Sequence, residues 1–275
     1  MIISHNNLTK VLIPLHDDFL DSVKDKWLAE PQKYVPNKDC IPMLDDWFCS
    51  TKVNNLQGLR NFPYKDITMG NTHFIESFVG KFGFDGFQVL DKEYAYYSFM
   101  GKWGVEAGNL EKNKPLIITI PHFTWGGIRP EWNDILDECE EKNIDIHMDM
   151  AWLTLSKGID IDFEHPSIAS VGMSISKYSM QWNRVGLRWC KQRTMDSITM
   201  FNHYYQPHTN GNLSSCGAHA IDNIPRDYGW NTYEKKYYEI CKVVDVTPTN
   251  LIHVVHKGDD NKSVGVSNLL RHGKF

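Results

Sequence analysis

Residues 144–152 read Ile-Asp-Ile-His-Met-Asp-Met-Ala-Trp, a short run in which apolar and polar side chains alternate. Such alternation predicts a buried β-strand, and Asp149 lies at its C-terminal end. A second strand-like run, residues 168–173, leads into Ser174-Ile175-Ser176-Lys177. In an open α/β sheet, ligands bind at the carboxyl ends of the strands. The pattern therefore predicts that Asp149 and Lys177 meet at one edge of a sheet.

The residue types at these two strand ends suit a phosphorylated aldehyde cofactor. A lysine amine can form a Schiff base with an aldehyde and can later act as the base that moves a substrate proton. A carboxylate beside a pyridine nitrogen keeps that nitrogen protonated, so that the ring accepts electrons from a carbanion. A serine hydroxyl and an arginine guanidinium suit a phosphate. These roles fall to Lys177, Asp149, Ser174 and Arg184.

The order of these motifs resembles that of the fold type I, aspartate aminotransferase-like enzymes that depend on pyridoxal phosphate (PLP). The motifs are Asp-x-Ala-aromatic at 149–152, Ser-x-Ser-Lys at 174–177 and Arg-x-Gly at 184–186. The resemblance implies a three-layer α/β/α large domain with a mostly parallel sheet and a reduced second lobe. It also implies that PLP is the cofactor, that Lys177 is the catalytic Schiff-base lysine, and that the chain is a truncated and divergent member of the family.

Further cofactor contacts follow from the resemblance. A Gly-Asn-Thr turn at 70–72 precedes a run with helical spacing, and a helix N-terminus offers free N–H groups to an anion. On the residues alone this turn is a helix cap, through Asn71 or Thr72; the resemblance makes it a phosphate site. In the family, an aromatic residue that follows a strand stacks on the ring, and Tyr94 follows the predicted strand 87–90. The implied cofactor-binding set is Gly70, Asn71, Thr72, Tyr94, Phe123, Asp149, Trp152, Ser174, Ser176, Lys177 and Arg184.

The sequence departs from the family pattern around the cofactor ring. The family's Asn-Pro-Thr-Gly loop, whose asparagine bonds the ring hydroxyl, is replaced by His-Phe-Thr-Trp-Gly-Gly at 122–127. Trp152 stands where many relatives have a tyrosine, and an indole N–H donates a hydrogen bond but cannot ionise. The spacing from Lys177 to Arg184 is one residue shorter than the pattern. No motif matches the arginine that binds the substrate carboxylate, and Arg271 is selected by position alone.

Two alternatives stand beside the PLP interpretation. His147-x-Asp149 has the spacing of an iron site with two histidines and one carboxylate, and His253, His256 or His272 would be the third ligand of a non-haem iron oxygenase. That chemistry is usually built in a jelly roll, whereas helices and strands alternate in this sequence. The other alternative is a catalytically altered or inactive protein that keeps the PLP fold, which the missing ring-oxygen ligands support.

Composition narrows the class of protein. The 275 residues are 41% hydrophobic and carry a net charge of −5 without a basic run, which predicts a globular protein that does not bind nucleic acid. No apolar run is long enough to cross a bilayer, so we expect no membrane partner. Six scattered cysteines and an N-terminus without a leader pattern predict a cytoplasmic protein. The resemblance and the 12% aromatic content predict a homodimer with its site near the subunit interface.

We expect three regions along the chain. Residues 1–65 form an N-terminal arm, with a helix at 17–27, and part of the small lobe; residues 66–190 form the PLP-binding core; residues 191–275 complete the large domain and form a reduced C-terminal lobe. The predicted function is a PLP-dependent transferase, most simply an aminotransferase, that acts on an amino acid or small amine. Decarboxylation, racemisation and elimination would use the same residues.

Overall fold

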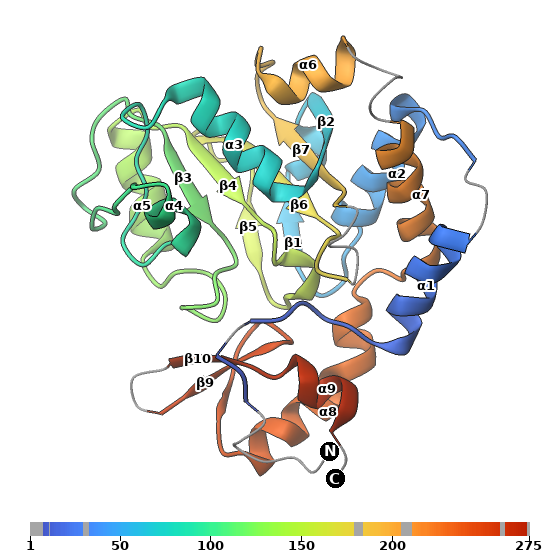
Figure 1. Cartoon of the computed structure of the whole chain (residues 1–275). Coiled ribbons are helices and arrows are strands. Elements are labelled where there is room, and N and C mark those ends of the chain that lie inside the picture. The colour runs from blue at the N-terminus through green and yellow to red at the C-terminus, as the bar shows by residue number, and fades with distance from the viewer. Residues whose placement is uncertain are drawn as a thin grey trace.

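The computed structural model describes residues 8–10, 12–29, 33–178, 184–204, 211–258 and 262–273. These residues form a larger lobe around a five-stranded sheet and a smaller lobe below it (Figure 1). No helix in the described ranges is both long enough and apolar enough to cross a membrane.

The five-stranded sheet has the strand order β2–β7–β6–β4–β3. Strands β3 (Leu116–Thr119), β4 (Ile146–Asp149) and β6 (Ile168–Ser174) run parallel. Strand β7 (Gly186–Cys190) is antiparallel to both of its neighbours, β6 and β2 (Tyr64–Thr68). Because β2 therefore points the same way as β6, only β7 runs against the rest, and the predicted mostly parallel sheet is confirmed.

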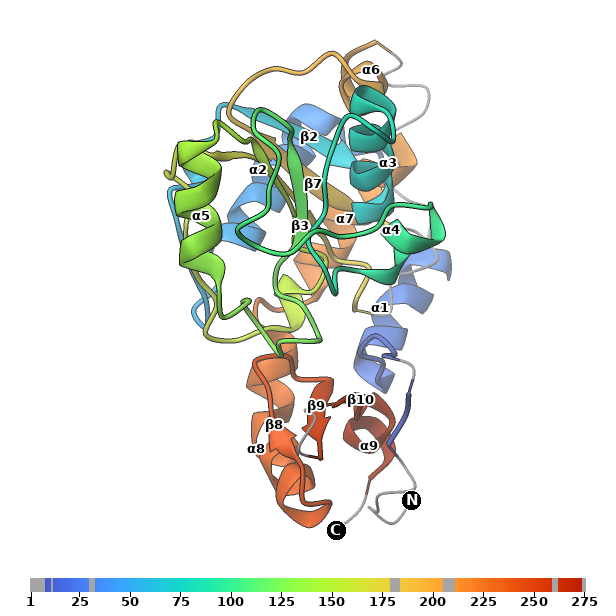
Figure 2. The ribbon, with the colours of Figure 1, turned by 90° about the vertical axis from the view of Figure 1, so that its left-hand side faces the viewer.

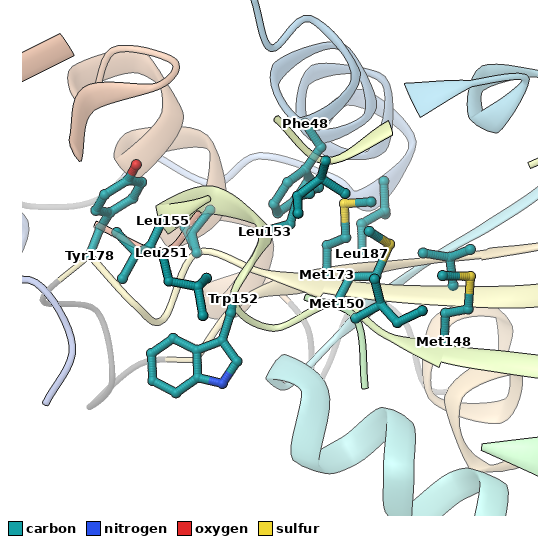
Figure 3. Close-up of a cluster of buried hydrophobic side chains, with 14 of the residues drawn as sticks. Phe48, Met148, Met150, Trp152, Leu153, Leu155, Met173, Tyr178, Leu187 and Leu251 are labelled. Carbon is teal, nitrogen blue, oxygen red and sulfur yellow. The ribbon is translucent and has the colours of Figure 1, made fainter. Parts of the chain in front are cut away.

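The two faces of this sheet differ because successive side chains of a strand point to opposite sides. One face carries apolar side chains that are buried in the main core: Ile118, Met148, Val171, Met173 and Leu187. Figure 3 shows Met148, Met173 and Leu187 packed together in this core. The other face carries buried polar side chains on the same strands: Thr119, His147, Asp149, Ser170 and Arg188. The second face is therefore the one that can hold chemistry.

Helices cover both faces, which confirms the three-layer α/β/α arrangement (Figure 1). On the polar face α3 (Gly70–Phe82) packs on β6, with α4 (Ala95–Phe99) and α6 (Ser197–His203) beside it. The apolar face packs against α2 (Asn37–Cys49) and α5 (Trp132–Glu141). Outside α2 lie α7 (Gly211–Asn223) and α1 (Asp18–Ala29), and α1 confirms the helix predicted in the N-terminal arm.

The smaller lobe is made by the C-terminal elements (Figure 2). It contains α8 (Tyr228–Val243), α9 (Ser267–His272) and an antiparallel sheet of β8 (Thr247–Pro248), β9 (Val254–Lys257) and β10 (Lys262–Gly265). Thr9 pairs with Gly265, so the N-terminal segment lies on this lobe. In the larger lobe, β1 (Asn55–Gln57) pairs with β5 (Asp160–Asp162), and short 3-10 helices span Leu59–Asn61 and Leu153–Leu155.

Two local predictions are wrong. The strand expected at 87–90 is reduced to single bridges, because Gln88 pairs with Leu116 whereas Leu90 pairs with Val105 in another segment. No side chain caps α3, which begins directly after Met69.

Gly172 of β6 lets α3 approach the sheet, because a Cβ atom there would lie 2.7 Å from the Phe74 ring. We expect Gly172→Ala to lower the free energy of unfolding by about 1–3 kcal/mol through this overlap. Gly80→Ala is the matched control, since Gly80 lies in α3 and a Cβ atom there would have no other atom within 4 Å. That substitution should stabilise the protein by up to about 1 kcal/mol. Urea unfolding measures both, and equal effects would contradict the packing described.

Candidate active site

A cavity of about 300 Å³ opens at the carboxyl edge of β3, β4 and β6, beneath the start of α3. Eight of the predicted cofactor residues line it: Asn71, Thr72, Tyr94, Asp149, Trp152, Ser176, Lys177 and Arg184. Residues that were not predicted complete the lining: Pro14, Ile75, Thr119 and Ala151. The sequence motifs therefore converge on one cavity, which we call the first cavity.

Asp149 ends β4 in this cavity and is buried, with 2% of its surface exposed. Its Oδ1 accepts hydrogen bonds from the Asn71 side-chain amide and from the Ala151 N–H, the latter at 3.0 Å. Burial raises the pKa of Asp149, while the bonds from Asn71 and Ala151 and the charge of Lys177 lower it. No hydrogen bond within the described residues uses Oδ2. That oxygen is therefore left to meet a ligand.

Asn71 holds this carboxylate in place and does not cap its own helix. Its side-chain nitrogen donates to Asp149 and also to the carbonyl oxygen of Gly172 in β6, at 2.7 Å. Both amide hydrogens are thereby used. The geometry ties Asn71 to the carboxylate rather than to the phosphate position that the sequence suggested.

Lys177 lies just beyond β6, where the N-terminal segment crosses it and Leu15 N–H donates to the Lys177 carbonyl oxygen at 3.1 Å. Burial lowers the pKa of Lys177 to about 8, with Asp149 raising it and Arg184 lowering it. A lysine with such a pKa is partly neutral at physiological pH, as a nucleophilic amine must be.

Trp152 supports this lysine from the adjacent loop. The Lys177 Nζ lies 3.8 Å from the centre of the Trp152 ring, which places the amine against an aromatic face. The Trp152 ring also stacks on the buried His253 ring of the smaller lobe, with centres 4.4 Å apart. Burial lowers the pKa of His253 to about 3, so that this imidazole is neutral. The two lobes thus meet directly behind the lysine.

A cationic and hydroxylic corner forms where α3 begins. Arg184 donates through Nη1 to Thr72 Oγ1 at 3.0 Å. Gly70 has φ +71°, and a Cβ atom there would lie 3.1 Å from Arg184 Cβ, so glycine lets the arginine lie against the helix start. A guanidinium, a hydroxyl and uncapped helix N–H groups together suit a phosphate.

The two serines before Lys177 have different places. Ser174 does not line the first cavity: its hydroxyl donates to the Val185 carbonyl at 3.0 Å and accepts from the Ser176 N–H at 3.1 Å. Ser176 lines the cavity, and its Oγ lies 2.9 Å from Ser174 Oγ. Ser174 therefore shapes the loop, and Ser176 is the serine placed to meet a ligand.

Two predicted residues lie elsewhere. Phe123 does not line the first cavity; its carbonyl oxygen accepts from Ser263 Oγ at 2.8 Å in the smaller lobe. Arg271 of α9 is paired with Asp18 and Asp21 of α1, at 3.2 and 2.9 Å. Arg271 does not line the first cavity, and these ion pairs hold its guanidinium against α1, which gives no support to its selection as a substrate ligand.

Thr119 is a lining residue that the sequence analysis missed. It ends β3 and stands opposite Asp149 in the parallel register between β3 and β4. Residues 115–121 read Pro-Leu-Ile-Ile-Thr-Ile-Pro, an apolar run typical of a buried strand, so the rule applied to Asp149 could also have identified the polar residue of this run. Pro14 had no comparable signal, because it arrives from a segment distant in sequence.

Comparison with solved structures finds the same fold in other proteins. The alanine aminotransferase from Pyrococcus furiosus is 13% identical with a TM-score of 0.59, and the alignment covers 92% of this chain and 76% of that one. A PLP-bound putative aminotransferase from Clostridium difficile 630 is 12% identical with a TM-score of 0.61, covering 91% and 77%. The chain has the aminotransferase fold.

The same fold occurs in a putative PLP-dependent beta-cystathionase from Corynebacterium diphtheriae, with 12% identity, a TM-score of 0.58 and coverage of 92% and 78%. No family model matches the sequence, and no curated protein does. The predicted fold type I resemblance is therefore confirmed at the level of structure, while the aminotransferase fold by itself leaves the reaction open.

Within the part of the chain that the structure describes, His147 and Asp149 have no third residue beside them that would complete the site of an iron oxygenase. His147 lies on the polar face with Asp149, but its ring packs on Phe78 of α3 at 4.7 Å and its Nδ1 lies 2.6 Å from Ser170 Oγ. Among the residues that the structure describes, no three His, Cys, Asp or Glu side chains are grouped so that they could hold a metal ion.

The groups around Lys177 determine the pH at which its amine titrates. Because Asp149 raises the pKa of this amine, Asp149→Asn should shift the half-point of Lys177 acetylation below pH 8. Competitive labelling of the cofactor-free protein with acetic anhydride, followed by mass spectrometry of the Lys177 peptide, measures the half-point. The control is Asp134→Asn on the exposed side of α5, which should leave the half-point unchanged. A higher half-point of Lys177 acetylation in the Asp149→Asn variant would show that the two groups do not interact as described.

Proposed function

We propose that the protein is a PLP-dependent enzyme that acts on an amino acid or a small amine, most simply as an aminotransferase. The observation that carries this proposal is the meeting of three groups in one cavity: a lysine of lowered pKa, a buried carboxylate with one unused oxygen, and a phosphate-type corner at a helix start. The fold supports it independently, since structures with this fold include a PLP-bound putative aminotransferase.

The residues fit the cofactor group by group. Thr72, Ser176 and Arg184 would hold the phosphate, and the start of α3 would add its N–H groups. Asp149 would receive the ring nitrogen on Oδ2, because Oδ1 is already occupied by Asn71 and Ala151. Tyr94 lines the same cavity with 40% of its surface exposed. One face of its ring stacks on Tyr96, with centres 6.0 Å apart, so the opposite face would stack on the cofactor ring.

The chemistry divides between two side chains. When bound, PLP supplies an electron sink for the carbanion formed at the substrate Cα. Lys177 would hold the cofactor covalently, and its Nζ, once released, would move the proton from the substrate Cα. Asp149 would keep the ring nitrogen protonated through Oδ2. Trp152 would keep the lysine amine near the reacting carbon, since the amine lies against its face.

Thr119 would take part of the role of the missing ring-oxygen ligands. Relatives use an asparagine and a tyrosine there, whereas this chain has the loop 122–127 and Trp152 in their places, and the Asn71 amide in the cavity already donates to Asp149 and Gly172. Thr119 lines that cavity beside Asp149 and carries a hydroxyl that can donate to a ring oxygen. A protein that keeps the fold without the reaction is the alternative, and covalent capture of the cofactor separates the two.

Covalent attachment gives the first test. With added PLP and then borohydride, the wild type should fix one equivalent of cofactor on Lys177, identified by peptide mapping. Lys177→Ala should fix none, and Lys235→Ala, which removes a surface lysine with 93% of its side chain exposed, should behave as the wild type. Label spread over surface lysines, or no label, would favour the inactive alternative.

The phosphate corner gives a second test. Arg184→Gln removes the guanidinium that lies beside Thr72, so PLP should bind about tenfold more weakly. Pyridoxal, which lacks the phosphate, should bind the variant and the wild type equally. Fluorescence titration of both ligands on both proteins measures this. An equal loss for PLP and pyridoxal would assign Arg184 to another part of the cofactor.

The form of the cofactor after a single turnover identifies the reaction. If the enzyme transaminates, a substrate amino acid or amine should convert bound PLP to pyridoxamine phosphate in a single turnover, detectable by chromatography of the released cofactor. Conversion should be lost in Lys177→Ala. Decarboxylation or elimination would return PLP unchanged while consuming the substrate, and would correct the reaction without removing the cofactor proposal.

A homodimer stays a prediction that rests on the resemblance to dimeric relatives. Exposed aromatic rings near Tyr94 are consistent with it, since Phe99 and Trp103 have 86% and 76% of their surfaces exposed. Analytical ultracentrifugation with bound PLP should give a dimer that Trp103→Ser weakens. A monomer at all concentrations would contradict the prediction.

A further inference from the structure

A second cavity of about 160 Å³ lies beneath the C-terminal half of α3, at the amino ends of β4 and β6. Its walls include three rings of α3 and three polar residues of the sheet: Phe74, Phe78, Phe82, His147, Ser170 and Arg188. It shares no lining residue with the first cavity. An engineered protein cavity of roughly 150 Å³ binds benzene, so this volume suits one six-membered ring.

The walls are suited to a flat apolar group. Phe78 packs on Phe82 and on His147, with ring centres 4.8 and 4.7 Å apart. Burial lowers the pKa of His147 to about 3, so that the imidazole presents a neutral aromatic wall. Its Nε2 is buried and has no hydrogen-bond partner among the described residues, whereas buried polar atoms in proteins usually have one. The cavity therefore combines aromatic walls with unused hydrogen-bonding capacity.

The charges around this cavity are predominantly positive. Lys81, Lys191, Arg188 and Arg193 line it, against the carboxylates of Asp145 and Asp196. Arg188 is already neutralised by Asp196 and Asp66, which leaves Lys81, Lys191 and Arg193 against Asp145. Lys81 and Arg193 are exposed residues. Lys81 Nζ lies 4.7 Å from the Phe82 ring centre, and Arg193 Cζ lies 5.7 Å from the Tyr64 ring centre. An anionic group on an aromatic ligand would thus meet cations at the mouth.

We propose that the second cavity binds a small aromatic carboxylate, with its ring against Phe78, Phe82 and His147 and its carboxylate at Lys81 and Arg193. The site lies on the same face of the sheet as the first cavity but at the opposite ends of β4 and β6. It needs neither Lys177 nor PLP, so it stands whether or not the proposed reaction is correct.

Benzoate is the probe for this site, and benzamide is its neutral counterpart of the same shape. Isotope-filtered NMR should give nuclear Overhauser contacts between benzoate and the rings of Phe78 and Phe82. Benzoate should bind the wild type about tenfold more tightly than benzamide does, since only benzoate gains the charge interactions. The double variant Lys81→Gln/Arg193→Gln should remove that preference, and Lys235→Gln should retain it.

Several results would overturn the proposal. These are no benzoate binding at millimolar concentration, contacts to Trp152 or Tyr94 of the first cavity instead, or equal affinity for benzoate and benzamide in the wild type. An unchanged preference in the double variant would also overturn it. Both substituted residues are exposed, so the variant is expected to fold, and benzamide binding to it checks that the cavity is intact.

Discussion

The side chain of Asn71 makes the contact on which the rest of the site depends. Its amide joins the first turn of α3 to Asp149 of β4 and to the Gly172 carbonyl of β6. If the buried Asp149 carboxyl group lost this partner, the folded protein would be destabilised by about 1–3 kcal/mol, and by more if the group is charged. The same bonds fix the helix start above the carboxyl edge of the sheet. The helix, the carboxylate and the neighbouring strand are thus tied together at this edge.

Strand alternation explains where polar groups can accumulate without disrupting the core. The apolar sides of the strands supply the main hydrophobic core, so the side chains facing α3 are free to be polar. The single helix α3 then spans both cavities, since Thr72 lines the first and Phe82 lines the second. The smaller lobe also contacts the site, because its His253 stacks on Trp152 behind Lys177.

Sequence reasoning worked where the physical signal is local. Asp149 and Lys177 were correctly placed at one edge of the sheet, because strand periodicity locates the ends of β4 and β6 and parallel strands present those ends together. It failed where the position depends on distant partners. Asn71 bonds a carboxylate 78 residues away, which no local pattern encodes. Arg271 was chosen by position, but ion pairs with α1 hold it elsewhere.

The most direct test of the central claim is the protonation of the cofactor ring nitrogen. PLP labelled with ¹⁵N in the ring, bound to the wild type, should give a chemical shift typical of a protonated pyridine, because Asp149 Oδ2 is left to accept that proton's hydrogen bond. Bound to Asp149→Ala, the same nitrogen should show the shift of an unprotonated ring. Identical shifts in the two proteins would contradict the role of Asp149, and with it the proposal that the first cavity holds the PLP ring against this carboxylate.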